Sequence, residues 1–104
     1  MIKARVKITF PATPEEFIRY QERLVGRELS EREKEVTAAW VDIFNRAHME
    51  GLRQNQTALD DFLARVDEWA GETAAGSAVH RFLLAARWWI SAAWEQGAKR
   101  SFSK

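Results

Sequence analysis

A chain of 104 residues with 46% hydrophobic and 30% charged side chains has the composition of one globular domain with a single core. Its 16 basic and 15 acidic residues nearly cancel, so the formal charge of +1 gives no overall field that would draw the protein to nucleic acid or to a membrane. The absence of cysteine excludes disulfides and cysteine zinc sites and is typical of a cytoplasmic protein. The longest apolar window, residues 82–94, is too short to cross a bilayer and contains Arg87, so we expect no membrane association.

The first element is predicted from the alternation of apolar and polar side chains over residues 2–10. A period of two is typical of a half-buried strand, with one face in the core and the other in solvent. The polar face carries Lys3, Arg5, Lys7 and Thr9. A lone strand leaves its backbone groups unpaired, so it needs the C-terminal tail, a second copy of the chain or the sheet of another protein as a partner. The sequence does not choose among these three partners.

Four helices follow the strand, and their bounds are predicted from the spacing of apolar residues and from the capping residues. The predicted helices span residues 14–25, 31–54, 58–70 and 77–97. Thr13 and Ser30 are each followed three residues later by a glutamate that completes a capping box, and Thr57 is the predicted cap of the third helix. Gly97 is interpreted as the end of the last helix, and the polar tail after it could form a short strand beside the first one. The sequence therefore predicts one mainly α domain over residues 1–104, with four helices and one N-terminal strand.

The predicted helix at residues 31–54 carries two apolar stripes, which indicates contact with two neighbouring elements. The main stripe, expected to face the core, consists of Val36, Ala39, Trp40, Ile43, Ala47 and Gly51. The lesser stripe consists of Val41, His48 and Leu52. Leu24 in the first helix and Trp69 in the third are also predicted core residues.

The last predicted helix is apolar on nearly all sides and contains three of the chain's five tryptophans. At about 100° per residue, one arc forms the predicted core face. It contains Val79, Phe82, Leu83, Ala86, Trp89, Ile90, Ala93, Trp94 and Gly97. Trp88 lies opposite the middle of this arc, so the helix is either central in its fold or covered by a partner, and the sequence leaves both open. The predicted partner-binding residues on the outward face are Arg81, Leu84, Trp88, Ala92 and Glu95.

Groups that could carry out catalysis or hold a metal ion are few. His48 and His80 lie on different predicted helices, and neither has a carboxylate or a second histidine three or four residues away on its own helix. We therefore expect no enzyme activity, metal, cofactor or small-molecule substrate. The alternative is an unrecognised enzyme that uses His48 or His80 as its acid–base group.

The N-terminal third of the chain combines a basic alternating strand, a proline, a helix that begins PEEF, a glycine turn and a serine-capped helix. This combination resembles the ribbon-helix-helix family of DNA-binding dimers. It implies that the strands of two copies pair across a two-fold axis and face the major groove of DNA. The residues that would face DNA are Lys3, Arg5, Lys7 and Thr9. Three extra residues after Pro11, Ala12 to Pro14, depart from the family's pattern.

We expect a small cytoplasmic protein that works by binding the surface of another macromolecule, as a regulatory, inhibitory or assembly factor. Tryptophan and arginine are favoured at interface hot spots, and the last helix places Trp88 and Arg81 on one outward face. The expected partner is another protein or a second copy of this chain, as in a homodimer. Compact chains without cysteine or catalytic motifs are also typical of accessory proteins of mobile elements. The alternative function is DNA binding by a dimer that uses the basic strand.

Overall fold

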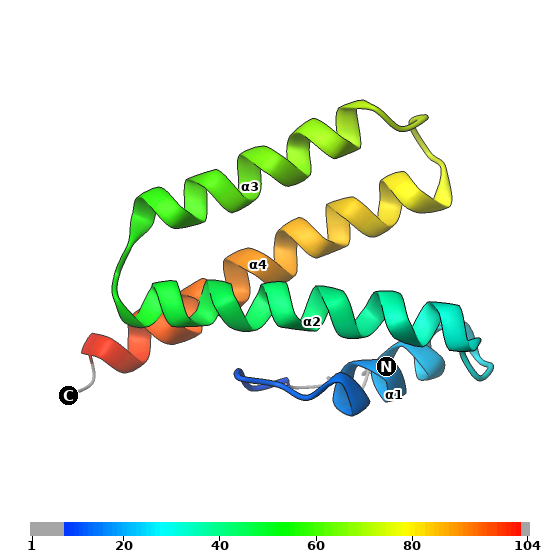
Figure 1. The fold of residues 1–104 in the computed structure, drawn as a ribbon, viewed down its shortest axis with the longest axis horizontal. Coiled ribbons are helices and arrows are strands. Elements are labelled where there is room, and N and C mark those ends of the chain that lie inside the picture. The colour runs from blue at the N-terminus through cyan, green and yellow to red at the C-terminus, as the bar shows by residue number, and fades with distance from the viewer. Residues whose placement is uncertain (1–7, 103–104) are drawn as a thin grey trace, which may run out of the picture.

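The computed structural model describes residues 8–102, and within that range the chain forms four helices and no strand (Figure 1). These are α1 (Pro14–Val25), α2 (Glu31–Leu52), α3 (Gln56–Gly71) and α4 (Ala78–Phe102). α4 packs most extensively along α2 and also against α3, whereas α1 packs against α2. The mainly helical fold predicted from the sequence is confirmed.

Local capping signals set most of the helix boundaries. α1 begins and ends at the predicted residues, and α2 and α3 differ from their predicted bounds by at most two residues. The Thr13 hydroxyl accepts a hydrogen bond from the Glu16 amide at 3.3 Å, and the Glu16 carboxylate accepts one from the Thr13 amide at 2.9 Å. An equivalent pair opens α2. The predicted cap of the third helix, Thr57, is wrong because the Asn55 side chain accepts from the Ala58 amide at 3.2 Å, which starts α3 earlier.

α4 ends five residues later than predicted, because Gly97 lies where α4 crosses α2 and does not end the helix. A Cβ atom built on Gly97 would overlap the carbonyl oxygen of His48 and lie 2.8 Å from the amide nitrogen of Leu52. A Cβ atom built on Gly51 of α2 would likewise overlap the carbonyl oxygen of Trp94. The two glycines therefore let the two helix backbones touch. The short strand predicted for the tail is wrong over its described residues, which are helical.

The N-terminal strand predicted at residues 2–10 is not seen in the part of it that the structure describes. Residues 8–10 belong to no strand, and residues 1–7 lie outside the described residues. The alternation continues along the described segment, with Ile8, Phe10 and Ala12 buried and with Thr9 and Pro11 exposed. The predicted alternation of buried and exposed side chains is therefore correct from residue 8 onwards, whereas the predicted pairing of these residues as a β-strand is wrong.

Two side-chain amides take the place of a partner strand for this segment. The Phe10 amide donates to Oε1 of Gln96 on α4 at 3.0 Å, and Nε2 of Gln96 donates to the Ile8 carbonyl at 3.1 Å. Asn45 on α2 binds both backbone groups of Ala12 in the same way, at 2.9 Å each. The hydrogen-bonding demand of these backbone groups is therefore met by side chains of the same chain.

Aromatic rings fill the region where α1, α2, α4 and the N-terminal segment meet. The ring centroid of Phe17 on α1 lies 4.9 Å from that of Trp89 on α4 and 5.3 Å from that of Phe44 on α2. Phe10 of the N-terminal segment is fully buried and lies 6.1 Å from both Phe17 and Trp89. This packing places Trp89, the neighbour of Trp88, in contact with the core.

Five residues predicted to face the core are exposed: Leu24, Val36, Ala39, Trp69 and Val79. Leu24, Trp69 and Val79 lie within three residues of a helix end, whereas Val36 and Ala39 lie on the side of the main stripe away from the buried residues of α2. On α2 the buried residues are Thr37, Val41, Phe44, Ala47, His48 and Gly51. This arc lies between the two predicted stripes, because α4 covers one side of α2 and α1 with the N-terminal segment covers the other.

Candidate functional site

The outward face of α4 exposes an apolar surface around Trp88. Trp88 is 62% exposed, more than any other tryptophan of the chain, and Leu84, one turn earlier, is 49% exposed. We name this surface the Trp88 face; it consists of Arg81, Leu84, Ala85, Trp88, Ser91, Ala92 and Glu95. The opposite side of α4 carries the buried residues Leu83, Ala86, Ile90 and Ala93. The structure therefore excludes burial of Trp88 within the monomer, and it brings the five predicted partner-binding residues together on one face.

The indole ring of Trp88 is supported from beneath by core rings. Its centroid lies 4.8 Å from that of Trp89 in an edge-to-face arrangement with an interplanar angle of 86°. Trp89 in turn contacts Phe17 and Tyr20 of α1, at centroid distances of 4.9 and 5.7 Å. Trp88 therefore contacts the packed core through Trp89, while most of its own surface stays in solvent.

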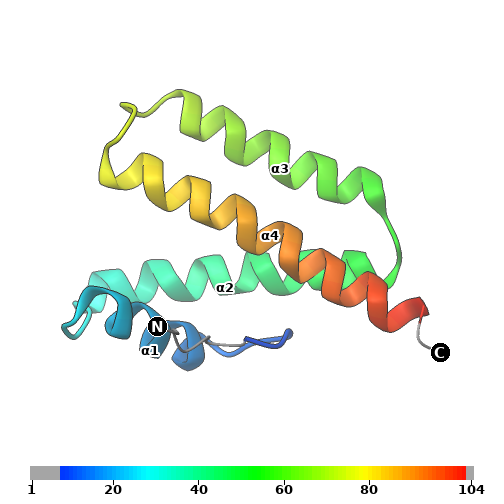
Figure 2. The same ribbon diagram turned by 180° about the vertical axis from the view of Figure 1, so that it is seen from behind.

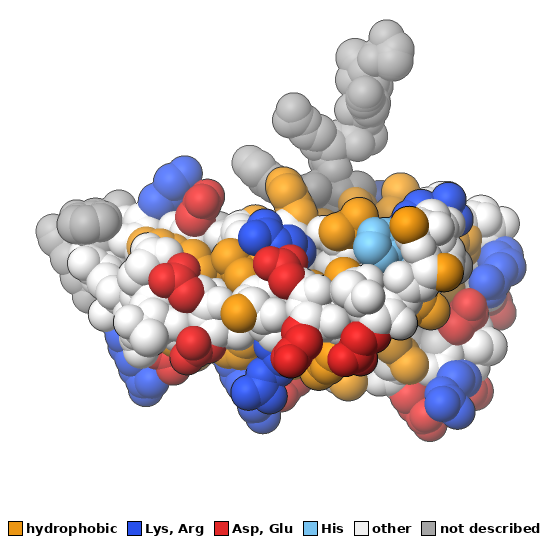
Figure 3. All heavy atoms as spheres, turned by 90° about the horizontal axis from the view of Figure 1, so that it is seen from above, with side chains coloured by type: hydrophobic (Ala, Val, Ile, Leu, Met, Phe, Trp, Pro, Cys, Tyr) orange, Lys and Arg blue, Asp and Glu red, His pale blue; other side chains and the backbone are white. Residues whose placement is uncertain are grey.

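Neighbouring elements hold α4 on both sides, and none of the described helices covers its outward face. On one side, Nε of Arg87 donates a 2.8 Å hydrogen bond to Oδ1 of Asp67 on α3. On the other side, Gln96 binds the N-terminal segment. Figure 2 shows α4 passing in front of α2, with α3 above it and α1 below it. Seen from above, over α3, acidic and basic side chains are mixed, and hydrophobic side chains reach the surface on both sides of them (Figure 3).

The residues predicted to face DNA lie mostly outside the described part of the chain. Thr9 is exposed, on the opposite side of the backbone from buried Ile8 and Phe10. Lys3, Arg5 and Lys7 lie outside the described residues. DNA binding by the N-terminal strand stays a prediction.

The two histidines do not form a common site. His48 is 1% exposed, and its Nε2 lies 3.3 Å from Nη1 of Arg100. A guanidinium only donates, so His48 accepts through Nε2 and carries its proton on Nδ1, which has no partner among the described residues. Burial, and then the charge of Arg100, lower the pKa of His48 and keep the ring neutral. His80 precedes Arg100 on α4 by 20 residues, roughly 30 Å at 1.5 Å per residue.

His80 has a structural position between two helices. Its Nδ1 lies 3.0 Å from the Thr73 hydroxyl and 3.2 Å from the Ala70 carbonyl oxygen, so it ties the start of α4 to the end of α3. Within residues 8–102, no group of three or more histidine, aspartate or glutamate side chains is placed to hold a metal ion.

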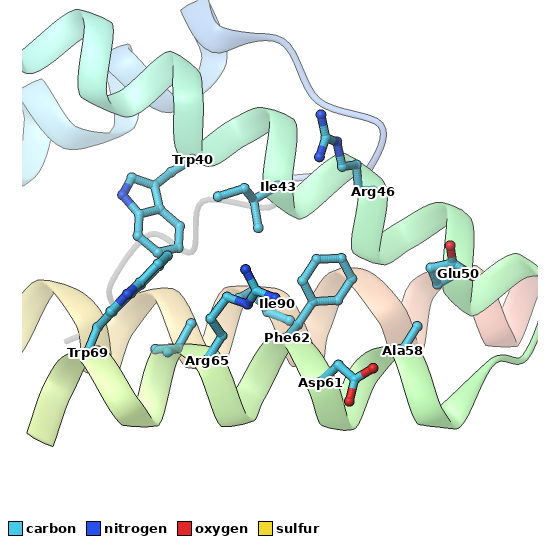
Figure 4. Close-up of a pocket in the computed structure, with 11 residues that line it drawn as sticks. Trp40, Ile43, Arg46, Glu50, Ala58, Asp61, Phe62, Arg65, Trp69 and Ile90 are labelled. Carbon is cyan, nitrogen blue, oxygen red and sulfur yellow. The ribbon is translucent and has the colours of Figure 1, made fainter.

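A second apolar surface, missed in the sequence, is a groove between α2 and α3 (Figure 4). Its volume is about 420 Å³, and Ile90 of α4 forms part of its lining. The apolar lining includes Trp40, Ile43, Phe62, Val66 and Trp69, and the rim carries Arg46, Glu50, Asp61 and Arg65. The two apolar stripes predicted for α2 were the signal that could have revealed this groove. Trp40 and Ile43 of the main stripe line the groove, whereas the buried residues of α2 lie beside them and face the core.

No protein family model, curated protein or solved structure matches the chain. Among the described residues, no helix is both long enough and apolar enough to cross a membrane. The case for a function therefore depends on the exposed surfaces described above.

Proposed function

We propose that the protein works by binding another protein chain through the Trp88 face, as a small regulatory, inhibitory or assembly factor without catalytic activity. The observation that supports this proposal is the exposure of Trp88 on a rigid aromatic base. A tryptophan side chain presents about 150–250 Å², so 62% exposure leaves roughly 90–150 Å² in water. Burying that area against a partner would contribute about 2–4 kcal/mol at 25 cal/mol per Å².

The polar residues of the Trp88 face are also suited to binding. Arg81 and Glu95 are exposed at its two ends, and neither takes part in an ion pair with another described residue. Their charges are therefore available to a partner at the rim of an apolar centre, which is the usual arrangement of a protein interface. Arginine and tryptophan together are also the residue types that contribute most often to binding hot spots.

Replacing Trp88 with glutamate tests this proposal. Because the side chain is mostly exposed, the Trp88→Glu variant should keep its helical circular dichroism and lose no more than about 1 kcal/mol of stability. It should lose binding, because a charge replaces the apolar centre of the face. The matched control is Met49→Glu, which puts the same charge at a 48% exposed apolar residue of another helix and should leave binding unchanged.

The measurement is capture by tagged wild type, Trp88→Glu and Met49→Glu from extracts of the native host, with each bait first checked by circular dichroism. A protein retained by the wild type and the Met49 variant but lost with the Trp88 variant would support the proposal. Equal retention by all three baits would contradict it. Unfolding of the Trp88 variant would show that this side chain stabilises the monomer, which the exposed position does not predict.

A further inference from the structure

Charged residues are placed at equal distances on either side of Trp88. Arg81 lies seven residues before it, and Glu95 lies seven residues after it. Seven residues are close to two helical turns, or about 10 Å, so all three side chains lie on one face of α4. The two charges are opposite in sign, and α4 extends beyond both of them.

Such an arrangement is complementary to itself. When two identical helices pack antiparallel about a two-fold axis, residues equally far before and after the axis face each other. With the axis at Trp88, Arg81 of each copy faces Glu95 of the other, and two ion pairs form. Parallel packing would instead bring Arg81 next to Arg81 and Glu95 next to Glu95, so the charges select the antiparallel arrangement.

The side-chain volumes match in the same register. Leu84, which is 49% exposed, faces the small side chain of Ala92 in the other copy, and Ala85 faces Ser91. Leu84 thus lies opposite a small side chain on both sides of the axis, and Ala85 and Ser91 are both small. The two Trp88 rings meet at the axis, where each covers the exposed surface of the other.

We propose that the occupant of the Trp88 face is a second copy of this chain, with the two α4 helices antiparallel about a two-fold axis at Trp88; this rests on the proposed function of that face. The seam is formed by one helix from each copy. It is therefore smaller than a standard protein interface, and we expect a dissociation constant on the order of micromolar.

Charge exchange tests the register of this dimer. The single variants Arg81→Glu and Glu95→Arg each place like charges together at both ends of the seam, and each should raise the dissociation constant about tenfold or more. Mixing the two variants in equal amounts should restore dimers. In the mixed pair, each introduced charge faces an introduced charge of opposite sign, and native Arg81 faces native Glu95. The matched control is Glu35→Arg, a charge reversal on an exposed residue of α2, which should not change the dimer.

Sedimentation velocity of the full chain, over a concentration series from micromolar to millimolar, measures each dissociation constant. Restored dimers in the mixture, together with a monomeric Trp88→Glu variant, would establish the antiparallel pairing. A wild-type protein that stays monomeric would overturn it, while capture of a different protein through Trp88 would still support the proposed function. A dimer that is insensitive to both charge reversals would also overturn the pairing, because it would use another register or another surface.

Discussion

Helix propensity and tertiary packing predict opposite effects of Gly97→Ala on the stability of the protein. Within a helix, alanine is more favourable than glycine by about 1 kcal/mol, so helix propensity alone predicts a more stable protein. In the structure, however, the new Cβ atom would overlap the backbone of α2 at His48 and lie 2.8 Å from the amide nitrogen of Leu52. Backbone atoms in a helix cannot rotate away as a flexible side chain can, so α2 and α4 must move apart.

The two effects can be compared in magnitude. Overpacking of a well-packed contact costs about 1–3 kcal/mol, and a clash with backbone belongs at the upper end of that range. Subtracting the gain of about 1 kcal/mol in helix propensity leaves a net destabilisation of about 2 kcal/mol. For a domain of this size, that loss corresponds to a melting temperature lower by roughly 10 °C.

Urea unfolding followed by tryptophan fluorescence measures the effect. The matched control is Gly71→Ala in the last turn of α3, where a Cβ atom would have no neighbour within 4 Å. That variant should be unchanged or more stable by up to about 1 kcal/mol. A Gly97→Ala protein as stable as the wild type would refute the direct backbone contact between α2 and α4. Gly51→Ala acts on the same crossing, so the double variant should lose less stability than the sum of the two single losses.

Two further predictions concern polar side chains of the helices. Gln96→Ala removes the hydrogen bonds to Phe10 and Ile8 and should lower the free energy of unfolding by about 2 kcal/mol. The Phe10 amide should then exchange its hydrogen faster, and an unchanged exchange rate would count against the anchoring role of Gln96. The pKa of His48 is lower in the folded state than its ordinary value of 6.5, so the unfolded chain binds the proton more readily. The free energy of unfolding should therefore be highest above pH 6.5 and fall as the pH drops below that value towards the folded pKa. Urea unfolding at a series of pH values should show a weaker pH dependence in His48→Leu than in the wild type. An equally steep dependence in that variant would assign the effect to other groups.

The parts of the structure that the sequence predicted well depend on residues close together in the chain. Thr13 and Ser30 cap helices through the amide three residues further on, so a few letters are enough to identify them. Helical phase places Trp88 opposite the core face of α4, because the residues on its far side are apolar at the spacing of one helix face. For the same reason the predicted partner-binding residues lie together on α4. The 62% exposure of Trp88 comes from the structure alone, since the sequence left open whether another helix covers it.

The parts that the sequence could not predict depend on contacts between distant residues. Asn45 and Gln96 are ordinary polar residues of helices, and nothing next to them indicates that they bind the backbone of residues 8–12. The groove between α2 and α3 similarly depends on how far two consecutive helices separate, which their own patterns do not specify.

The amino-acid sequence by itself determined that the chain is mainly helical and where three of its four helices end to within two residues, because capping and helical phase act within one or two turns. It also placed Trp88 opposite the core face of α4, but only the tertiary structure decided that this side is exposed. The tertiary structure decided whether Gly97 ends a helix or lets two helices touch, and what binds the N-terminal segment. Both questions concern backbone groups that meet side chains or carbonyls dozens of residues away. A glycine or an amide looks the same in the sequence whether or not such a partner is present.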